Sequence, residues 1–229
     1  MRLVRFYFQK RKGLSQMTTE TSTIRITATF DESRKHRYTL RREWDSTKKK
    51  SACIIMSNAS TADVTTGDLT GLLIQNNLAA LGYGAVTCVN LFSFRCQKLD
   101  LSKDVDISQL TNSDNENQIV QAVRDSDICI IAIGSLAKSY KRAAVYQARL
   151  FALLREQGLQ HKAHAITAPC GTQGLHPLSG KLRVTGSWTL EPFPLPSLPQ
   201  DEKNNAEVHT DTNKSAVSGS GKKRGKNER

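Results

Sequence analysis

The chain of 229 residues has no apolar run near the roughly 18 residues that a membrane-spanning helix needs, so no membrane partner is expected. Its five cysteines are an odd number without a C-x-x-C pair, which argues against a zinc site or a disulfide framework. A reducing cytoplasm is then the simplest compartment. The sequence also lacks a Walker-type or G-x-G-x-x-G loop. We therefore expect no metal and no other cofactor.

Positive charge is abundant, with 33 lysines and arginines against 21 aspartates and glutamates and a formal net charge of +12. Such an excess favours phosphate-bearing partners, because binding releases counterions from a polyanion. One basic cluster runs through residues 34–50, and another closes the chain at 221–229. The expected partner is a nucleic acid or nucleotide, whose backbone would contact Arg37, Arg41, Arg42 and Lys48.

Composition divides the chain into three parts. Residues 1–22 are expected to be disordered or a wrongly assigned leader. Residues 1–16 mix cations into an apolar stretch and a threonine-rich segment starts at Met17, which indicates either an upstream translation before Met17 or a short basic arm. Residues 23–191 carry the strand and helix patterns of one α/β domain. Residues 192–229 are dominated by proline, serine, asparagine and charge, so a disordered basic tail is expected. Nothing in the sequence specifies an oligomeric state.

Within the middle part, apolar strand-like segments alternate with segments that have leucine at helical spacing. Strands are expected at 24–30, 37–44, 51–57, 85–91, 127–133 and 164–168, and helices at 69–81, 115–124 and 136–157. Strands that are apolar on both faces belong to parallel sheets covered by helices. The prediction is a three-layer α/β sandwich with a mostly parallel central sheet, preceded by antiparallel strands. Residues 37–44 are expected to form a hairpin with 51–57.

Polar side chains follow the apolar strands at the points where the strands end, and the segment S-N-A-S-T-A-D at 57–63 is the richest of them. Ligands of open α/β sheets bind at the carboxyl ends of strands. The candidate catalytic residues are Asn58, Asp63 and His176, and the candidate substrate-binding residues are Ser60, Asn90, Phe92, Arg95, Gly134 and Ser135.

Several of these candidates have an equally good structural interpretation. Asn90 is as suited to tying a loop as to contacting a ligand. Phe92 and Phe94 are more often core residues than stacking platforms. The Gly134–Ser135 turn fits either a phosphate cradle or a close contact between strand and helix.

Five ordered motifs are more specific than any single residue. They are R-Y-x-L-x-R-x-W-D at 37–45, N-A-S-T-A-D at 58–63, G-Y-G at 82–84, V-N-L-F-S-F-R at 89–95 and H-P-L at 176–178. Their order resembles DUF1643, a bacterial and phage family of unknown function. That family usually has Asn-Pro-Ser where this chain has Asn58-Ala59-Ser60, Asp-Asp-Pro-Thr at 67–70, and Trp-Gly at 133–134. Loss of the proline removes a rigid turn from the first loop.

A second resemblance, to the uracil-DNA glycosylase superfamily, rests on the order of strand-end motifs at Asn58, Asn90, 134–137 and 176–177. It implies hydrolysis of an N-glycosidic bond. Asn58 or Asp63 would position water, Phe92 or Phe94 would stack on the base, Asn90 would read the base edge, and His176 would hydrogen-bond the departing base.

Two other functions remain open from the sequence. Ala59 and the basic tail favour a non-catalytic nucleic-acid-binding accessory protein of a phage or mobile element. A small-nucleotide hydrolase or transferase would use the Gly134–Ser135 turn for phosphate, but the absent Walker loop argues against it.

Overall fold

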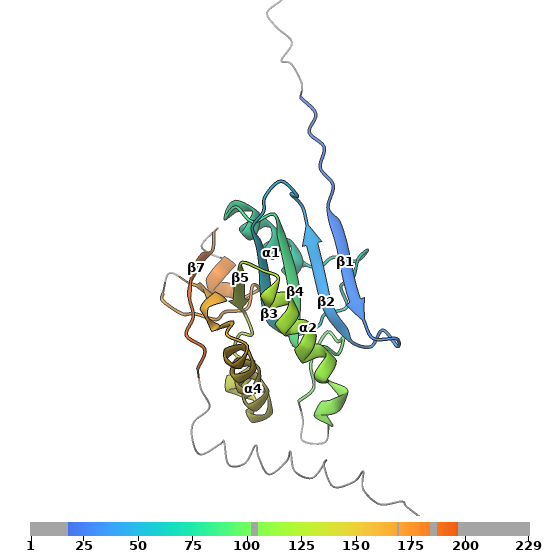
Figure 1. Cartoon of the computed structure of the whole chain (residues 1–229), viewed down its shortest axis with the longest axis vertical. Coiled ribbons are helices and arrows are strands. Elements are labelled where there is room, and N and C mark those ends of the chain that lie inside the picture. The colour runs from blue at the N-terminus through green and yellow to red at the C-terminus, as the bar shows by residue number, and fades with distance from the viewer. Residues whose placement is uncertain (1–17, 102–104, 169, 184–186, 197–229) are drawn as a thin grey trace, which may run out of the picture.

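The computed structural model describes residues 18–101, 105–168, 170–183 and 187–196. One seven-stranded sheet runs through these residues in the order β1-β2-β4-β3-β5-β6-β7 (Figure 1). Its strands are β1 (Arg25–Phe30), β2 (Arg37–Glu43), β3 (Ser51–Asn58), β4 (Ala85–Phe92), β5 (Ile128–Ile131), β6 (Ala163–Thr167) and β7 (Thr189–Pro192). The helices are α1 (Leu69–Ala80), α2 (Ser113–Arg124), α3 (Leu136–Ser139), α4 (Lys141–Glu156) and α5 (Gly180–Arg183), with 3-10 turns at Ile107–Gln109 and Gln160–Lys162.

The centre of the sheet is parallel and its edges are antiparallel. Strand β3 pairs in parallel with both β4 and β5, and β5 pairs in parallel with β6. Strands β1 and β2 form an antiparallel hairpin beside β4, and β7 runs antiparallel to β6. The predicted α/β class and mostly parallel central sheet are therefore confirmed.

Helices cover both faces of the sheet, which gives the expected three layers. On one face, Ile74 and Leu78 of α1 pack on alternate residues of the central strands, including Ile54 and Ile130. On the other face, α2 and α4 pack on the intervening residues, such as Ile55. Because neighbouring strand residues point to opposite faces, strands covered on both sides must be apolar at every position, as β3 and β4 largely are.

The arrangement creates a crevice at the carboxyl end of β3. The chain leaves β3 through α1 to reach β4 on one side, and leaves β4 through α2 to reach β5 on the other side. The two connections cover opposite faces of the sheet, so the loops that lead into them diverge. Such a switch point is where open α/β sheets bind ligands.

Two expectations about individual elements were wrong, and one strand was not predicted. Strand β2 does not pair with β3: its partners are β1 and β4, because β4 lies between β2 and β3. The helix expected at 136–157 is divided at Tyr140, whose extended backbone (φ −135°, ψ 116°) separates α3 from α4. Strand β7, which the sequence pattern does not predict, covers the outer edge of β6.

The expectations for residues 1–17 and for the tail beyond residue 196 lie outside the described residues. Among the residues that are described, no helix is both long and apolar enough to cross a lipid bilayer.

Candidate functional site

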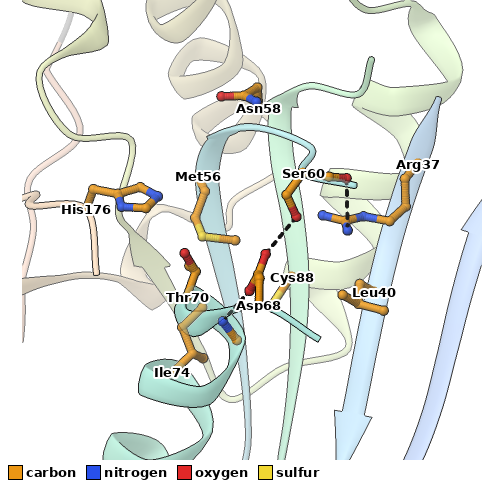
Figure 2. Close-up of a pocket in the computed structure, with 11 residues that line it drawn as sticks. Arg37, Leu40, Met56, Asn58, Ser60, Asp68, Thr70, Ile74, Cys88 and His176 are labelled. Atoms are coloured by element: carbon orange, nitrogen blue, oxygen red, sulfur yellow. Dashed lines mark hydrogen bonds between the residues drawn. The ribbon is translucent and has the colours of Figure 1, made fainter. Parts of the chain in front are cut away.

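A pocket of about 50 Å³ lies at the switch point, between the carboxyl end of β3 and the first turn of α1 (Figure 2). Its walls combine polar and charged groups over an apolar floor. It is lined by Arg37, Leu40, Met56, Asn58, Ser60, Asp68, Thr70, Gly71, Ile74, Cys88 and His176. Three of the residues that the sequence singled out for chemistry therefore come together here: Asn58, Ser60 and His176.

Arg37 reaches the pocket because of an irregularity in β2. The pairing of β1 with β2 steps from Thr29–Thr39 to Phe30–Arg37, which leaves Tyr38 as an extra residue. A bulge of this kind changes which face a side chain occupies. Arg37 consequently lines the same pocket as Leu40, although the odd spacing of the two residues would place them on opposite faces of a regular strand.

The guanidinium group of Arg37 is enclosed, with only 2% of the residue exposed. Its Nη1 donates hydrogen bonds to the carbonyl oxygens of Ala62 and Ser60, and its Nη2 donates to Asn90 Oδ1 at 3.4 Å. Burial lowers the pKa of Arg37 below its ordinary value. The Nε atom is buried as well and has no hydrogen-bond partner among the described residues.

Asp68 and Ser60 together form another part of the pocket wall. Asp68 is the N-cap of α1, where its Oδ1 accepts the backbone N–H of Gly71 at 2.7 Å. Its Oδ2 accepts the hydroxyl of Ser60 at 2.8 Å. The helix start therefore fixes the carboxylate, and the carboxylate in turn fixes the serine side chain.

His176 closes the pocket from the loop that follows β6. Figure 2 shows its ring directed toward Met56 and the interior of the pocket. Its Nδ1 lies 3.2 Å from the backbone N–H of Leu178 and accepts it, so the neutral ring carries its proton on Nε2. Burial lowers the pKa of His176 from 6.5, and the negative charge of Asp68 opposes that shift.

Gly134, just after β5, holds the backbone of this histidine loop. Its φ of +74° is a left-handed conformation that favours glycine, and its N–H donates to the carbonyl of Gly174 at 3.1 Å. A Cβ at position 134 would lie 3.3 Å from the Cβ of His176. Gly134 therefore acts by permitting close packing against His176. The neighbouring Ser135 is exposed and makes no side-chain cap at the start of α3.

Asn58 and Asn90 tie the strand ends together beside the pocket. Asn58 Nδ2 donates to the carbonyl of Cys96 at 3.1 Å, and Asn90 Nδ2 donates to the carbonyl of Asn58 at 2.8 Å. Asn90 is 1% exposed, and its Oδ1 accepts from Arg37. Asn90 thus holds the side chain of Arg37 without lining the pocket itself, whereas Asn58 lines the pocket directly.

The remaining predicted residues lie outside the pocket. Asp63 is the centre of a turn: its Oδ1 accepts the backbone N–H groups of Thr65 and Thr66, and these bonds lower its pKa to about 2. Arg95 lies 3.8 Å from Asp63 and donates to the carbonyl of Thr61 at 2.8 Å. Phe92 is fully buried in the core, where its ring contacts that of Tyr146.

The basic cluster expected to flank the site is spread along β2. Arg41 and Lys48 line a second hollow of about 240 Å³ that includes Ser51 and Ala85, the first residues of β3 and β4. That hollow lies at the amino ends of these strands. Ser51 precedes Asn58 along β3 by seven residues, so at about 3.3 Å per residue the hollow is roughly 23 Å from Asn58. Arg42 instead lies along α1, since a Cβ at Gly71 would be 3.6 Å from its Nε.

Of the two charged groups that the pocket brings together, sequence reasoning did not single out Asp68 and gave Arg37 a different role. Asp68 and Thr70 occupy positions of the family's Asp-Asp-Pro-Thr segment, which the sequence marks only as a departure from the family pattern. Arg37 was predicted to contact a phosphate backbone. Its position in the pocket could not be predicted, because nothing in the sequence marks the bulge that turns it inward.

A search of curated proteins and a search of solved structures each returned no match. The sequence profile of one family matches residues 37–178, which is more than half of the chain and contains every residue that lines the pocket. The chain belongs to that family, which is described as a protein of unknown function (DUF1643).

Proposed function

We propose that the pocket binds a nucleobase and that the protein hydrolyses the N-glycosidic bond joining this base to a sugar. The observation that carries the proposal is the hydrogen bond that the backbone N–H of Leu178 donates to His176 Nδ1. Because its Nδ1 accepts the N–H of Leu178, a neutral imidazole presents the Nε2 proton to the pocket. A fixed donor of this kind stabilises negative charge that develops in a transition state.

In the proposed reaction the bond between the anomeric carbon and the base nitrogen breaks, and its electron pair leaves with the base. Negative charge then builds on the base while the sugar gains oxocarbenium character. His176 Nε2–H donates a hydrogen bond to the departing base. Water adds to the anomeric carbon and loses a proton to solvent, and the base takes up a proton as it leaves.

Asn58 is the residue proposed to orient the water. Its Nδ2 is held by the carbonyl of Cys96, which fixes the direction of the amide group, and its Oδ1 accepts only from the neighbouring Ser57 hydroxyl at 3.2 Å among the described residues. One lone pair of Oδ1 can therefore accept a water proton. Asp63, the alternative from the sequence, is committed to its turn.

The test is base release from labelled nucleosides, nucleotides and oligonucleotides that carry uracil, hypoxanthine and oxidised or hypermodified bases. Release should fall by about 10²-fold or more in His176→Ala and Asn58→Ala, the usual scale for one transition-state donor or positioning group. His161→Ala and Asn76→Ala, which alter exposed residues away from the pocket, are the matched controls and should retain full release. Equal loss in a control, or no release of any base, would contradict the proposal.

The hollow at the amino end of the sheet favours a second candidate, a nucleic-acid-binding accessory role. It gathers Arg41, Lys48, Lys49 and Lys50 around two acidic residues. Arg41 pairs with Glu43 at 3.1 Å and Lys48 with Asp45 at 3.9 Å, which leaves Lys49 and Lys50 as excess positive charge. A pure binding protein should lose affinity on charge reversal at these lysines, with steep salt dependence, and should show no base release.

A further inference from the structure

The wall of the pocket contains a buried donor that the described part of the protein does not use. Arg37 is almost wholly enclosed, yet its Nε has no hydrogen-bond partner there, whereas Nη1 and Nη2 are held by Ala62, Ser60 and Asn90. Leaving a charged donor buried without an acceptor is costly, so such a group points to a ligand that supplies the acceptor. Figure 2 shows the guanidinium directed from β2 toward Ser60 and Asp68.

The same wall contains an acceptor with capacity to spare. Asp68 receives one hydrogen bond on each carboxylate oxygen, from Gly71 N–H and from the Ser60 hydroxyl. An ionised carboxylate can accept about twice that number. Asp68 and Arg37 do not form an ion pair with each other, although both line the pocket and their charges interact. The pocket therefore presents one donor and one acceptor to whatever lies between them.

We propose that Arg37 and Asp68 select nucleobases that carry a lactam edge, an oxo group beside a ring N–H. This inference rests on the proposed function, because it names the class of base that the pocket takes. The oxo group accepts from Arg37, and the adjacent N–H donates to Asp68. Uracil and hypoxanthine have this edge.

Amino bases are mismatched at both positions. Adenine and cytosine place an amino group where the lactam has its oxo group, so that two donors face each other at Arg37. Their neighbouring ring nitrogen is an acceptor, which faces the carboxylate of Asp68. Sites that hydrogen-bond a buried polar edge discriminate strongly, because a mismatched ligand leaves the buried groups unpaired.

The volume and lining of the pocket leave room for the edge of a planar ring. A volume of about 50 Å³ is several times the roughly 10–15 Å³ that one water needs. The floor is apolar and is formed by Leu40, Met56, Ile74 and Cys88. A ring edge that enters toward Arg37 and Asp68 leaves its sugar on the side of the pocket where His176 and Asn58 lie (Figure 2).

The test is calorimetric titration of the full chain with two matched pairs, inosine against adenosine and uridine against cytidine. We expect the lactam member of each pair to bind at least tenfold more tightly. Equal affinity within the pairs, preference for the amino member, or no binding of any nucleoside would overturn the inference. Inorganic phosphate is titrated separately, and tighter binding of phosphate than of inosine would overturn it by identifying an anion site instead.

Asp68→Asn distinguishes base reading from a structural role. Asparagine caps helices about as well as aspartate, so the start of α1 should be kept, and thermal unfolding checks this. The variant should lose the preference for inosine over adenosine by tenfold or more, because an amide can rotate to donate to the ring nitrogen of adenine. Asp114→Asn, at an exposed position in the first turn of α2, is the control and should keep the preference.

A preserved preference in Asp68→Asn would show that Asp68 does not read the base. Because calorimetry measures binding and the release assay measures turnover, the two proposals can fail separately. Lactam-selective binding without base release would refute the hydrolase alone. Release of amino and lactam bases at equal rates would refute the selection alone.

Discussion

Replacing Gly134 by alanine should disturb both the stability of the protein and the position of His176. A φ of +74° is a left-handed conformation, which costs an L-residue with a side chain about 1–2 kcal/mol. Gly158, just after α4, has a φ of +70° and no atom within 4 Å of the place that a Cβ would occupy, so Gly158→Ala carries the backbone cost alone. At Gly134 the new methyl group would also lie 3.3 Å from the Cβ of His176, which must move by a few tenths of an ångström.

Urea unfolding followed by tryptophan fluorescence measures the first effect: Gly158→Ala should lose about 1–2 kcal/mol of unfolding free energy, and Gly134→Ala should lose at least as much. An NMR titration of the His176 ring and the initial rate of base release measure the second effect, and only Gly134→Ala should alter them. If the His176 titration and the release rate of Gly134→Ala match those of the unchanged protein, Gly134 does not position His176. If Gly158→Ala is as stable as the unchanged protein, the backbone argument fails.

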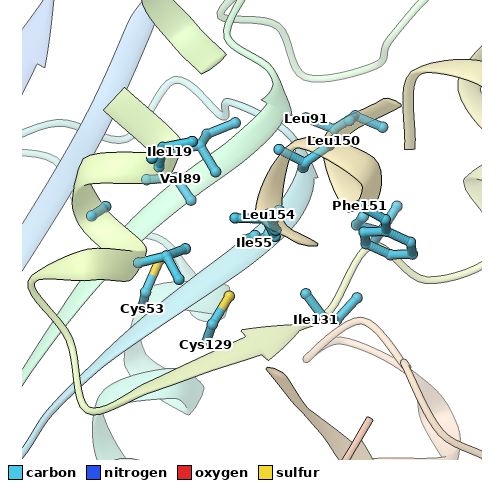
Figure 3. Close-up of a cluster of buried hydrophobic side chains, with 14 of the residues drawn as sticks. Cys53, Ile55, Val89, Leu91, Ile119, Cys129, Ile131, Leu150, Phe151 and Leu154 are labelled. Atoms are coloured by element: carbon cyan, nitrogen blue, oxygen red, sulfur yellow. The ribbon is translucent and has the colours of Figure 1, made fainter. Parts of the chain in front are cut away.

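Three further outcomes follow from the core and from the titrating groups. Phe151 is 1% exposed and packs on the face of the sheet that carries α2 and α4 (Figure 3), so Phe151→Ala should cost about 3–5 kcal/mol in urea unfolding. The pKa of Asp63 is lowered from 3.8 to about 2, so its carboxylate stabilises the fold fully above pH 3.8 and this stabilisation is lost as the pH falls toward 2. In denaturant titrations, Asp63→Asn should therefore be less stable than the unchanged protein at neutral pH. Near pH 2 the two proteins should be equally stable. The pKa of His176 is lowered below 6.5, so the unfolded chain takes up a proton more readily than the folded chain, and stability falls as the pH drops below 6.5. In a plot of the urea midpoint against pH, His176→Gln should reduce this fall.

The sequence predicted which segments form the central sheet better than it predicted which strands lie side by side. Apolar runs such as those of β3 and β4 require cover on both faces, and this requirement implied a parallel sheet between helices. The same pattern contains no information about which strand lies beside which. The hairpin expected between 37–44 and 51–57 therefore failed, because β4, which comes later in the chain, occupies the place next to β2.

The site was only partly predictable, for reasons that can be named. Asn58 and Ser60 follow directly from the rule that ligands bind at strand ends, and His176 from its motif. Asp68 has the local signature of a helix cap, and only the tertiary fold makes that cap a pocket wall. Arg37 enters the pocket through a one-residue bulge in β2, which strand periodicity does not reveal.

Asp63 is a predicted site residue that the structure places outside the pocket. A carboxylate that closely follows a strand end fits the pattern of a catalytic acid, yet Asp and Asn also stabilise turns by accepting backbone N–H groups. Here both Thr65 and Thr66 donate to it. The side chain is held by its own loop, and the carboxylate of the pocket comes from Asp68.

The most direct test of the central claim is to follow the oxygen atom of water. The protein is incubated with a lactam nucleoside or an oligonucleotide containing that base in water enriched in heavy oxygen, and the products of early time points are analysed by mass spectrometry. Hydrolysis of the N-glycosidic bond predicts heavy oxygen on the anomeric carbon of the sugar, an unlabelled free base, and loss of both products in His176→Ala. Heavy oxygen in the base or in phosphate would contradict the account, because water would then attack a different bond.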